Sequence, residues 1–394
     1  MKKISFILFI FFCSHLPTGL MAASTDTISA HMLIHLLAQQ QVQSAKFFTT
    51  GTFPSYRTYR YNTTKPDDNI FFTGLIVFTL KQLYPLTDSA DKILIDSIIE
   101  RAKPAFKKFK NKTGRNTYNF WSTYPPEVFP NGGCLNLKNR SMALPDDMDD
   151  TVIDLLALGT DSTSASAVHL LMQQYTNHLN GKIIRNTKKS LKKLPAYSTW
   201  FGKKMPIEFD VCVLANILYF VQNNHLLFAK ADSATVELLK ISIEKKYIFK
   251  STTIVSPEYQ RTPVVLYHFA RLMSLSGFDL LHEFKPVLVQ KAHQILSNPS
   301  TNYFDKIIVA TALLRWGENI NAPLKMGVPQ IQNFFRNNQF VFFKANMSSI
   351  LPNPFKMIFE KLNIGQFNYF SPAYNIVLLL EYLLLQQQYN QGHP

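Results

Sequence analysis

The sequence predicts an all-α protein, and the architecture that it favours is an α/α toroid of about six helical hairpins. Apolar residues recur at helical spacing through most of the chain. Strongly apolar segments alternate with segments that have one apolar and one polar face. Glycine is scarce, at 14 of 394 residues, which argues against a turn-rich β protein. Because a helix that is apolar all round must be buried on every side, an inner ring of helices wrapped by an outer ring accounts for the alternation.

The first residues of the chain have the pattern of a secretory signal. A basic start at Lys2-Lys3 precedes the apolar run Ile4–Cys13, and the small residues Ala22-Ala23 follow. The apolar run is shorter than the roughly 20 residues that span a bilayer. We therefore expect residues 1–22 to be a signal peptide and residues 23–394 to be a single toroid domain. The mature protein is expected in the periplasm or outside the cell.

Two sets of helical segments make up the expected rings. The inner set is apolar almost all round and comprises Ile70–Leu83, Thr151–Leu158, Val211–Val221, Val264–Leu275, Lys306–Trp316 and Tyr374–Leu385. The outer set is amphipathic and comprises Ile28–Gln43, Asp91–Phe109, Ser164–Leu179, Ala234–Tyr247, Phe284–Leu296 and, with a weaker pattern, Val328–Phe342. Each inner segment begins at a polar cluster with proline, aspartate or serine, which are common at helix starts. In a toroid these starts meet on one rim, where we expect a ligand site.

The chain is basic, with a formal net charge of +15. This balance favours anionic partners such as acidic glycans, phosphate groups or a membrane surface. Basic residues concentrate between positions 182 and 204 without any acid, and they are Lys182, Arg185, Lys188, Lys189, Lys192, Lys193, Lys203 and Lys204. A solvated loop and helix face explains this run, and the functional alternative is a patch that faces anions or a membrane. No nucleic-acid motif is present, and we expect a monomer that binds no nucleic acid.

Two cysteines, Cys134 and Cys212, follow the predicted signal peptide. An oxidising compartment would permit a disulfide between them. Their spacing contains no CxxC or Cys/His zinc pattern.

Four aspartates crowd into five residues, Asp146-Asp147-Met148-Asp149-Asp150, at the start of the second inner segment. One capping acid and one acid in the first turn would satisfy the free amides and the helix dipole. Further carboxylates repel one another, so either one carboxyl is protonated or a cation lies among them. An exposed helix start with surplus caps is the simpler alternative. Asp154 continues the same helical face into an apolar stretch, where a buried acid needs a partner. Arg261 and Arg271 are candidates to pair with the acidic rim.

The string from Pro145 to Thr151 resembles the Asp-x-Asp-Asp-Thr motif of squalene–hopene cyclases and other class II terpene cyclases. Those enzymes carry the motif at the start of an inner helix of an α/α barrel. Here Asp147, Asp149 and Asp150 match its three aspartates. The resemblance implies that Asp149 is a general acid that protonates an alkene or an epoxide. Two neighbouring carboxyls raise the pKa of one of them, and aromatic walls can stabilise carbocations.

The same string also fits the Asp-Asp-x-x-Asp motif of class I synthases through Asp146, Asp147 and Asp150. That motif binds magnesium and a diphosphate, so these three residues are candidate ligands for Mg²⁺ or Ca²⁺. A non-catalytic binding protein with a cation at its acidic rim is a further alternative, because clustered carboxylates suit hard cations.

A glycoside hydrolase or polysaccharide lyase of the six-hairpin type is the third hypothesis. Hydrolysis of a glycosidic bond needs two carboxyl groups that flank it. In either enzyme the ligand would be a small molecule or a glycan in a central cavity. The residues expected to bind it begin or line the inner helices and are Asp67, Asp68, Asn69, Asp210, Asn216, Trp121, Trp200 and Tyr374.

Overall fold

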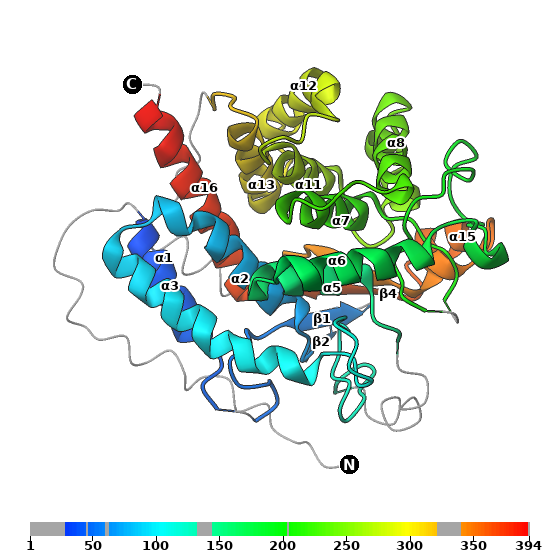
Figure 1. Ribbon diagram of the computed structural model, residues 1–394. Coiled ribbons are helices and arrows are strands. Elements are labelled where there is room, and N and C mark those ends of the chain that lie inside the picture. Colours follow the sequence, from blue (N-terminus) through cyan, green and yellow to red (C-terminus); the bar gives the residue numbers. More distant parts are fainter. Residues whose placement is uncertain are drawn as a thin grey trace, which may run out of the picture.

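The computed structural model describes residues 28–44, 46–59, 63–131, 144–202, 205–320 and 340–392 (Figure 1). The predicted signal peptide, Cys134, Lys203, Lys204 and most of the predicted helix 328–342 lie outside the described residues. Within the described part of the chain, no helix is both long and apolar enough to cross a membrane.

The six strongly apolar segments are helices, as predicted. They are α2 (Phe71–Leu83), α5 (Met148–Leu158), α7 (Val211–Asn223), α11 (Thr262–Met273), α13 (Tyr303–Arg315) and α16 (Pro372–Gly392). Each packs against the next one in this order, and α16 packs against α2, so their contacts form a closed cycle. Almost every residue of α2, α5 and α7 is buried, which explains why these helices are apolar on all faces.

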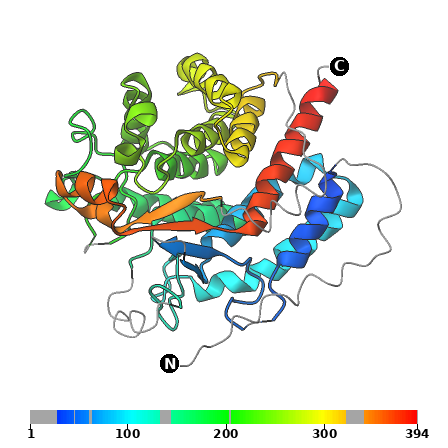
Figure 2. The ribbon, with the colours of Figure 1, turned by 180° about the vertical axis from the view of Figure 1, so that it is seen from behind.

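Five of the six segments predicted to be amphipathic helices contain helices. They are α1 (Ala30–Gln40), α3 (Ser89–Ala102), α6 (Ser162–Met172), α8 (Lys230–Glu244) and α12 (Lys285–Ser297). Figures 1 and 2 show α1 and α3 beside α2 and α16, and α12 beside α13, in agreement with the helix contacts. Of these, α1 packs against α16, α3 against α2, α8 against α7 and α12 against α13.

Shorter elements connect these helices. Among the described residues, short α-helices are α9 (Tyr247–Lys250), α10 (Thr252–Val255) and α15 (Phe355–Lys361). Single 3₁₀ turns are η2 (Tyr84–Leu86), η3 (Lys103–Lys108), η5 (Gln173–Tyr175), η6 (Leu179–Gly181), η7 (His282–Phe284) and η8 (Met347–Ile350).

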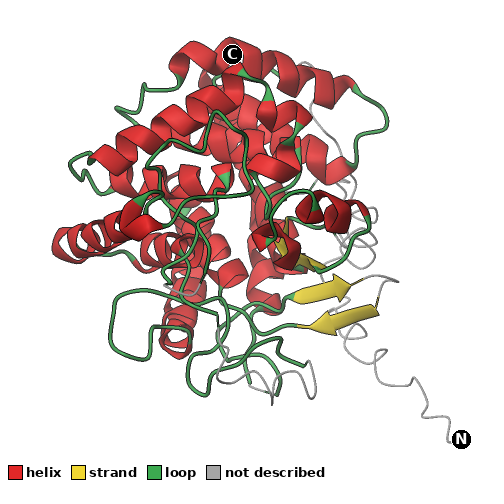
Figure 3. Ribbon diagram, turned by 90° about the vertical axis from the view of Figure 1, so that its right-hand side faces the viewer, coloured by secondary structure: helices red, strands yellow, loops and turns green. Residues whose placement is uncertain are grey.

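The all-α fold class is wrong, because the protein also contains a four-stranded antiparallel sheet (Figure 3). Its strands run in the order β2 (Thr63–Pro66), β1 (Tyr56–Tyr59), β4 (Gln366–Phe370) and β3 (Phe343–Asn346). Tyr56 pairs with Pro66 on one side and with Phe370 on the other. The sheet satisfies backbone groups of the segments that precede α2 and α16, where no helix does so.

The sheet carries an aromatic cluster to the starts of the inner helices. The Phe343 ring of β3 lies with its centroid 5.2 Å from the Phe71 ring of α2, and it stacks on Tyr369 of β4 at 5.1 Å. The backbone amide of Lys344 donates to the carbonyl of Glu258, just before α11. The strands therefore form one wall of the space above the helix starts.

Candidate functional site

A pocket opens where the starts of α2, α5 and α7 meet the loop before α11 and strand β3. Its cavity volume is about 90 Å³. The empty space amounts to about 610 Å³ when the solvent-filled mouth is counted as well. Four acidic groups line it among mainly apolar and aromatic walls. The lining residues are Phe71, Phe120, Trp121, Leu144, Pro145, Asp147, Asp149, Asp150, Thr199, Trp200, Val213, Glu258, Tyr259, Phe343 and Ala345. The pocket thus holds all three aspartates that match the cyclase motif.

Asp149 is hydrogen-bonded to side chains of two other elements, α7 and the loop before α11. Its Oδ1 accepts a hydrogen bond from Asn216 Nδ2 at 2.6 Å, and its Oδ2 accepts one from the Tyr259 hydroxyl at 2.5 Å. Burial raises the pKa of Asp149 to about 7, although the hydrogen bonds from Asn216 and Tyr259 act to lower it. A carboxyl with this pKa can both give and take a proton near neutral pH.

A buried arginine lies behind Asp149. Arg271 of α11 donates from Nη2 to Asn216 Oδ1 at 2.5 Å, and it is 1% exposed. It forms no ion pair with an acid of the described chain, and its guanidinium lies over the rings of Phe78 and Tyr267. The expected pairing of Arg271 with the acidic rim is therefore indirect and passes through Asn216. The other candidate, Arg261, pairs with Asp305 of α13 instead.

Asp147 and Asp150 form a second unit of the pocket. Asp147 caps α5, with its Oδ1 accepting from the Asp150 amide at 2.7 Å. The two side chains also hydrogen bond to each other. Burial, and then the negative charge and hydrogen bond of Asp147, raise the pKa of Asp150 well above its usual range. A proton shared by the pair would relieve the repulsion that the sequence pattern implied.

Asp154 lies one turn deeper and does not line the pocket. It is completely buried, and neither carboxyl oxygen has a hydrogen-bond partner among the described residues. Burial raises the pKa of Asp154 well above its usual range, and the negative charges of Asp147 and Asp149 act in the same direction. Gly74 of α2 makes room for it, because a Cβ atom at position 74 would lie 2.3 Å from Asp154 Oδ1.

Asp146 has a structural role. Its Oδ2 accepts from Asn111 Nδ2 at 2.6 Å, from Arg115 Nη2 at 3.0 Å and from the Thr117 hydroxyl. These bonds fasten the 111–117 loop to the start of α5. Of the three residues predicted to bind Mg²⁺ or Ca²⁺, Asp146 is thus already engaged. Within the described residues, no three His, Cys, Asp or Glu side chains are placed to hold a metal ion.

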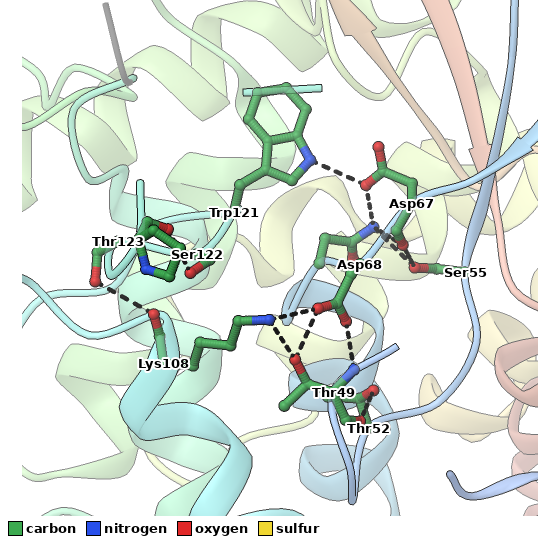
Figure 4. Close-up of polar contacts among 11 residues, drawn as sticks. Thr49, Thr52, Ser55, Asp67, Asp68, Lys108, Trp121, Ser122 and Thr123 are labelled. Atoms are coloured by element: carbon green, nitrogen blue, oxygen red, sulfur yellow. Dashed lines mark hydrogen bonds and ion pairs between the residues drawn. The ribbon is translucent and has the colours of Figure 1, made fainter. Parts of the chain in front are cut away.

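Asp67, Asp68 and Asn69 are not among the residues that line the pocket. Figure 4 shows Asp67 bonded to Trp121, and Asp68 bonded to Thr49 and Lys108. Asp67 forms a buried ion pair with Arg57 and accepts from Trp121 Nε1 at 3.0 Å. Asp68 accepts from the Thr49 hydroxyl at 2.7 Å and from Lys108 Nζ at 3.0 Å. Asn69 donates to Asp67 Oδ1 at 2.9 Å. Asp67 therefore fixes the indole of Trp121, a residue that lines the pocket.

Asp210 positions two pocket residues that the sequence analysis did not select. Its Oδ1 caps α7 through the amide of Cys212, and its Oδ2 accepts from the amides of Glu258 and Tyr259 at 2.9 and 3.3 Å. Burial raises the pKa of Asp210 to about 6. The predicted site residue is therefore a brace for the loop before α11, and Glu258 and Tyr259 reach the pocket from that loop. Cys212 is buried with a free thiol.

Of the two remaining aromatic residues predicted to bind a ligand, Trp200 reaches the pocket and Tyr374 does not. Trp200 lines the pocket, and its Nε1 donates to Glu208 Oε2 at 2.9 Å. Tyr374 is completely buried in α16, where it packs against Phe72 and Phe342, and it does not reach the pocket. The sequence pattern did not distinguish Glu258, because acids occur in several of the polar clusters before the inner helices. Its position after Pro257 and close to a helix start was the available signal.

No family model and no curated protein matches this sequence. The fold and the site together define the class of this protein: a cycle of six buried helices with a pocket at their starts, lined by carboxyl and aromatic side chains.

Proposed function

We propose that the pocket is the active site of an enzyme that begins its reaction by protonating an apolar substrate, with Asp149 as the general acid. The observation that carries this proposal is the meeting of the Asp147, Asp149 and Asp150 carboxyls with a mainly aromatic wall. Protonation of a carbon–carbon double bond or an epoxide requires a carboxylic acid that stays protonated near neutral pH. Burial raises the pKa of Asp149 to about 7, which meets this requirement.

The proton balance of the first step is simple. The Asp149 O–H bond breaks and leaves a carboxylate. The proton bonds to one alkene carbon, whose π bond is used, or to the epoxide oxygen, whose C–O bond opens to a hydroxyl. In either case a carbocation remains on the neighbouring carbon. Asn216 and Tyr259 then donate hydrogen bonds to that carboxylate, and Arg271 compensates its charge through Asn216. The faces of the pocket aromatics stabilise the carbocation.

The size of the pocket bears on the substrate. A cavity volume of about 90 Å³ admits one end of a molecule, while the rest would extend through the open mouth. A polyprenoid with a terminal double bond or epoxide fits this description.

The test is turnover of three probes, farnesol, squalene and 2,3-epoxysqualene, analysed for cyclised or isomerised products by gas chromatography and mass spectrometry. We expect wild-type protein to form product and Asp149→Asn to lose at least about 100-fold of the rate, as expected for removal of a general acid. Asp154→Asn is the matched control, because it changes a buried acid on the same helix outside the pocket. Equal rates for Asp149→Asn and wild type would refute the proposal.

Glycan cleavage is a second candidate, and Glu258 is the observation that favours it. Glu258 from the loop before α11 and Asp149 from α5 line the same pocket, as two carboxyls must in a glycoside hydrolase. Trp121 and Trp200 offer indole faces against which a sugar ring could stack. Release of reducing ends from neutral and acidic polysaccharides, lost in both Glu258→Gln and Asp149→Asn, would favour this reaction over protonation of an alkene.

Export remains part of the proposal. A mature N-terminus at residue 23 or 24, measured by mass spectrometry of protein recovered outside the cytoplasm, would support the predicted signal peptide. An intact Met1 would argue against it.

A further inference from the structure

An exposed apolar ridge follows strand β3. It consists of Met347, Phe355, Met357, Ile358 and Leu362, whose side chains are 47–57% exposed. Most large apolar side chains of the described protein are buried, whereas these five fall within sixteen residues. Exposed apolar residues grouped in this way mark an interaction surface.

The ridge is held out from the body of the protein. Strands β3 and β4 fix its two ends. In its middle, Lys356 is buried and lies 3.9 Å from Glu360, and Asn346 Nδ2 donates to Glu360 Oε1 at 3.2 Å. Since Lys356 turns inward, Phe355, Met357 and Ile358 on either side of it turn outward.

A basic segment, residues 182–193, lies against the ridge. The Asn186 side chain donates to the carbonyls of Ser349 and Leu351, which joins the two segments directly. Figures 1 and 2 both show α15 beside this part of the chain. The segment carries Arg185, Lys188, Lys189, Lys192 and Lys193, and none of these five forms an ion pair with a described acid. It also exposes Ile183 at 54%.

We propose that the ridge and the basic segment together form a docking surface for an anionic phospholipid bilayer. Apolar side chains that enter the headgroup boundary, flanked by unpaired lysine and arginine, suit an interface with acidic lipids. The charge complementarity favours a lipid surface over an apolar protein partner, which would leave these cations uncompensated. The inference stands apart from the reaction proposed above, because it uses none of the pocket acids.

The surface adjoins the pocket along the chain. Thr199 and Trp200, which line the pocket, closely follow the basic segment. Ala345, another lining residue, stands two positions before Met347, the first residue of the ridge. A bilayer docked here would lie close to a site whose walls are mainly apolar.

The experiment is co-sedimentation of the full chain with vesicles of phosphatidylcholine alone and of phosphatidylcholine with 30% phosphatidylglycerol. We expect binding to the acidic vesicles at least tenfold stronger than to the neutral ones, and a fall in that preference at high salt. Phe355→Ser/Ile358→Ser and Lys189→Glu/Lys193→Glu should each weaken binding at least tenfold. All variants share one N-terminus, so the predicted leader contributes equally to each.

Matched controls come from exposed residues elsewhere. Leu227→Ser removes an apolar side chain that is 92% exposed, and Lys107→Glu/Lys112→Glu makes the same change of charge as the test pair. Both should bind as wild type does, and all variants should keep the wild-type circular dichroism spectrum. Equal binding by wild type and both test variants would overturn the proposal. Equal loss in the controls, or loss of self-association instead of vesicle binding, would also overturn it.

Discussion

Asn216 of α7 donates its side-chain amide to the Asp149 carboxylate at 2.6 Å, across 67 residues of sequence. Its carbonyl oxygen accepts from Arg271 at the same time. The Asn216 side chain therefore connects the deeply buried guanidinium of Arg271 to Asp149, the acid that we place at the centre of the reaction. An asparagine suits this place because it offers one donor and one acceptor in a fixed geometry.

Replacing Asn216 with alanine should break this connection. Both Arg271 and Asp149 would lose a buried partner, which costs about 1–3 kcal/mol of unfolding free energy. The pKa of Asp149 should rise, because the Asn216 hydrogen bond lowers it. Urea denaturation at pH 7 measures the first effect. Asn224→Ala, at the end of the same helix and only half-buried, is the control and should cost less. Equal costs would mean that the connection contributes nothing particular.

The stability of the protein should depend on pH through Asp149. Its pKa is about 7 in the folded protein and 3.8 in the reference state, so the folded state binds the extra proton. The contribution of this raised pKa to the free energy of unfolding is fully present below about pH 4, and it is lost as the pH rises towards 7. The loss amounts to at most about 4 kcal/mol for a shift of this size. Asp149→Asn should therefore melt higher than wild type at pH 8, and the advantage should shrink at pH 4.5. A pH-independent difference between the two melting temperatures would contradict the assignment.

Gly74 and Asp154 should be coupled by packing. Gly74→Ala would bring a Cβ atom to 2.3 Å from Asp154 Oδ1 and 3.2 Å from Ile153 Cγ2. Such overpacking costs about 1–3 kcal/mol. Because Asp154→Ala removes the carboxyl, the double variant should be more stable than the sum of the single effects predicts. Chemical denaturation of all four proteins closes the cycle, and additive effects would show that the contact is not strained.

The ion pair behind Trp121 should matter more than its neighbour. Asp67→Asn leaves the Arg57 charge buried without its partner, which costs about 3–5 kcal/mol. Asp68→Asn removes the partner of Lys108, whose side chain is 33% exposed and can reach water. We therefore expect a clearly smaller loss of stability for Asp68→Asn. A larger loss for Asp68→Asn would contradict the roles given to these two acids.

The helices could be predicted from the sequence because burial on all sides leaves a local signal. The uninterrupted apolar run of α7, from Val211 to Val221 apart from Asn216, needs no knowledge of its neighbours. The sheet left no such signal. Its strands have four or five residues each, and β1 pairs with β4 some 300 residues away. β1 and β2 are neighbours along the chain, but strands of four residues are too short for a clear alternating pattern. The pairing of β1 with β4 leaves no local signal in the sequence.

Three of the four acids that line the pocket could be named from the sequence, but the roles of the acidic cluster could not all be assigned. Crowding at the start of α5 indicated raised pKa values, and the pocket contains Asp147, Asp149 and Asp150. Asp146 belongs to the same cluster of aspartates, yet its carboxylate binds the 111–117 loop and does not line the pocket. Tyr259 was missed because its contact with Asp149 depends on the packing of α11 against α7, which spacing along the chain does not reveal.

The protonation state of Asp149 is the most direct measure of the central claim. Protein labelled with ¹³C at the aspartate carboxyls can be titrated by NMR from pH 4 to 9, and the Asp149 signal is assigned by its absence from Asp149→Asn. We expect that signal to titrate near pH 7, as a buried general acid must. Titration near pH 4 would show an ordinary carboxylate at neutral pH, and Asp149 could not then start the reaction by giving up a proton.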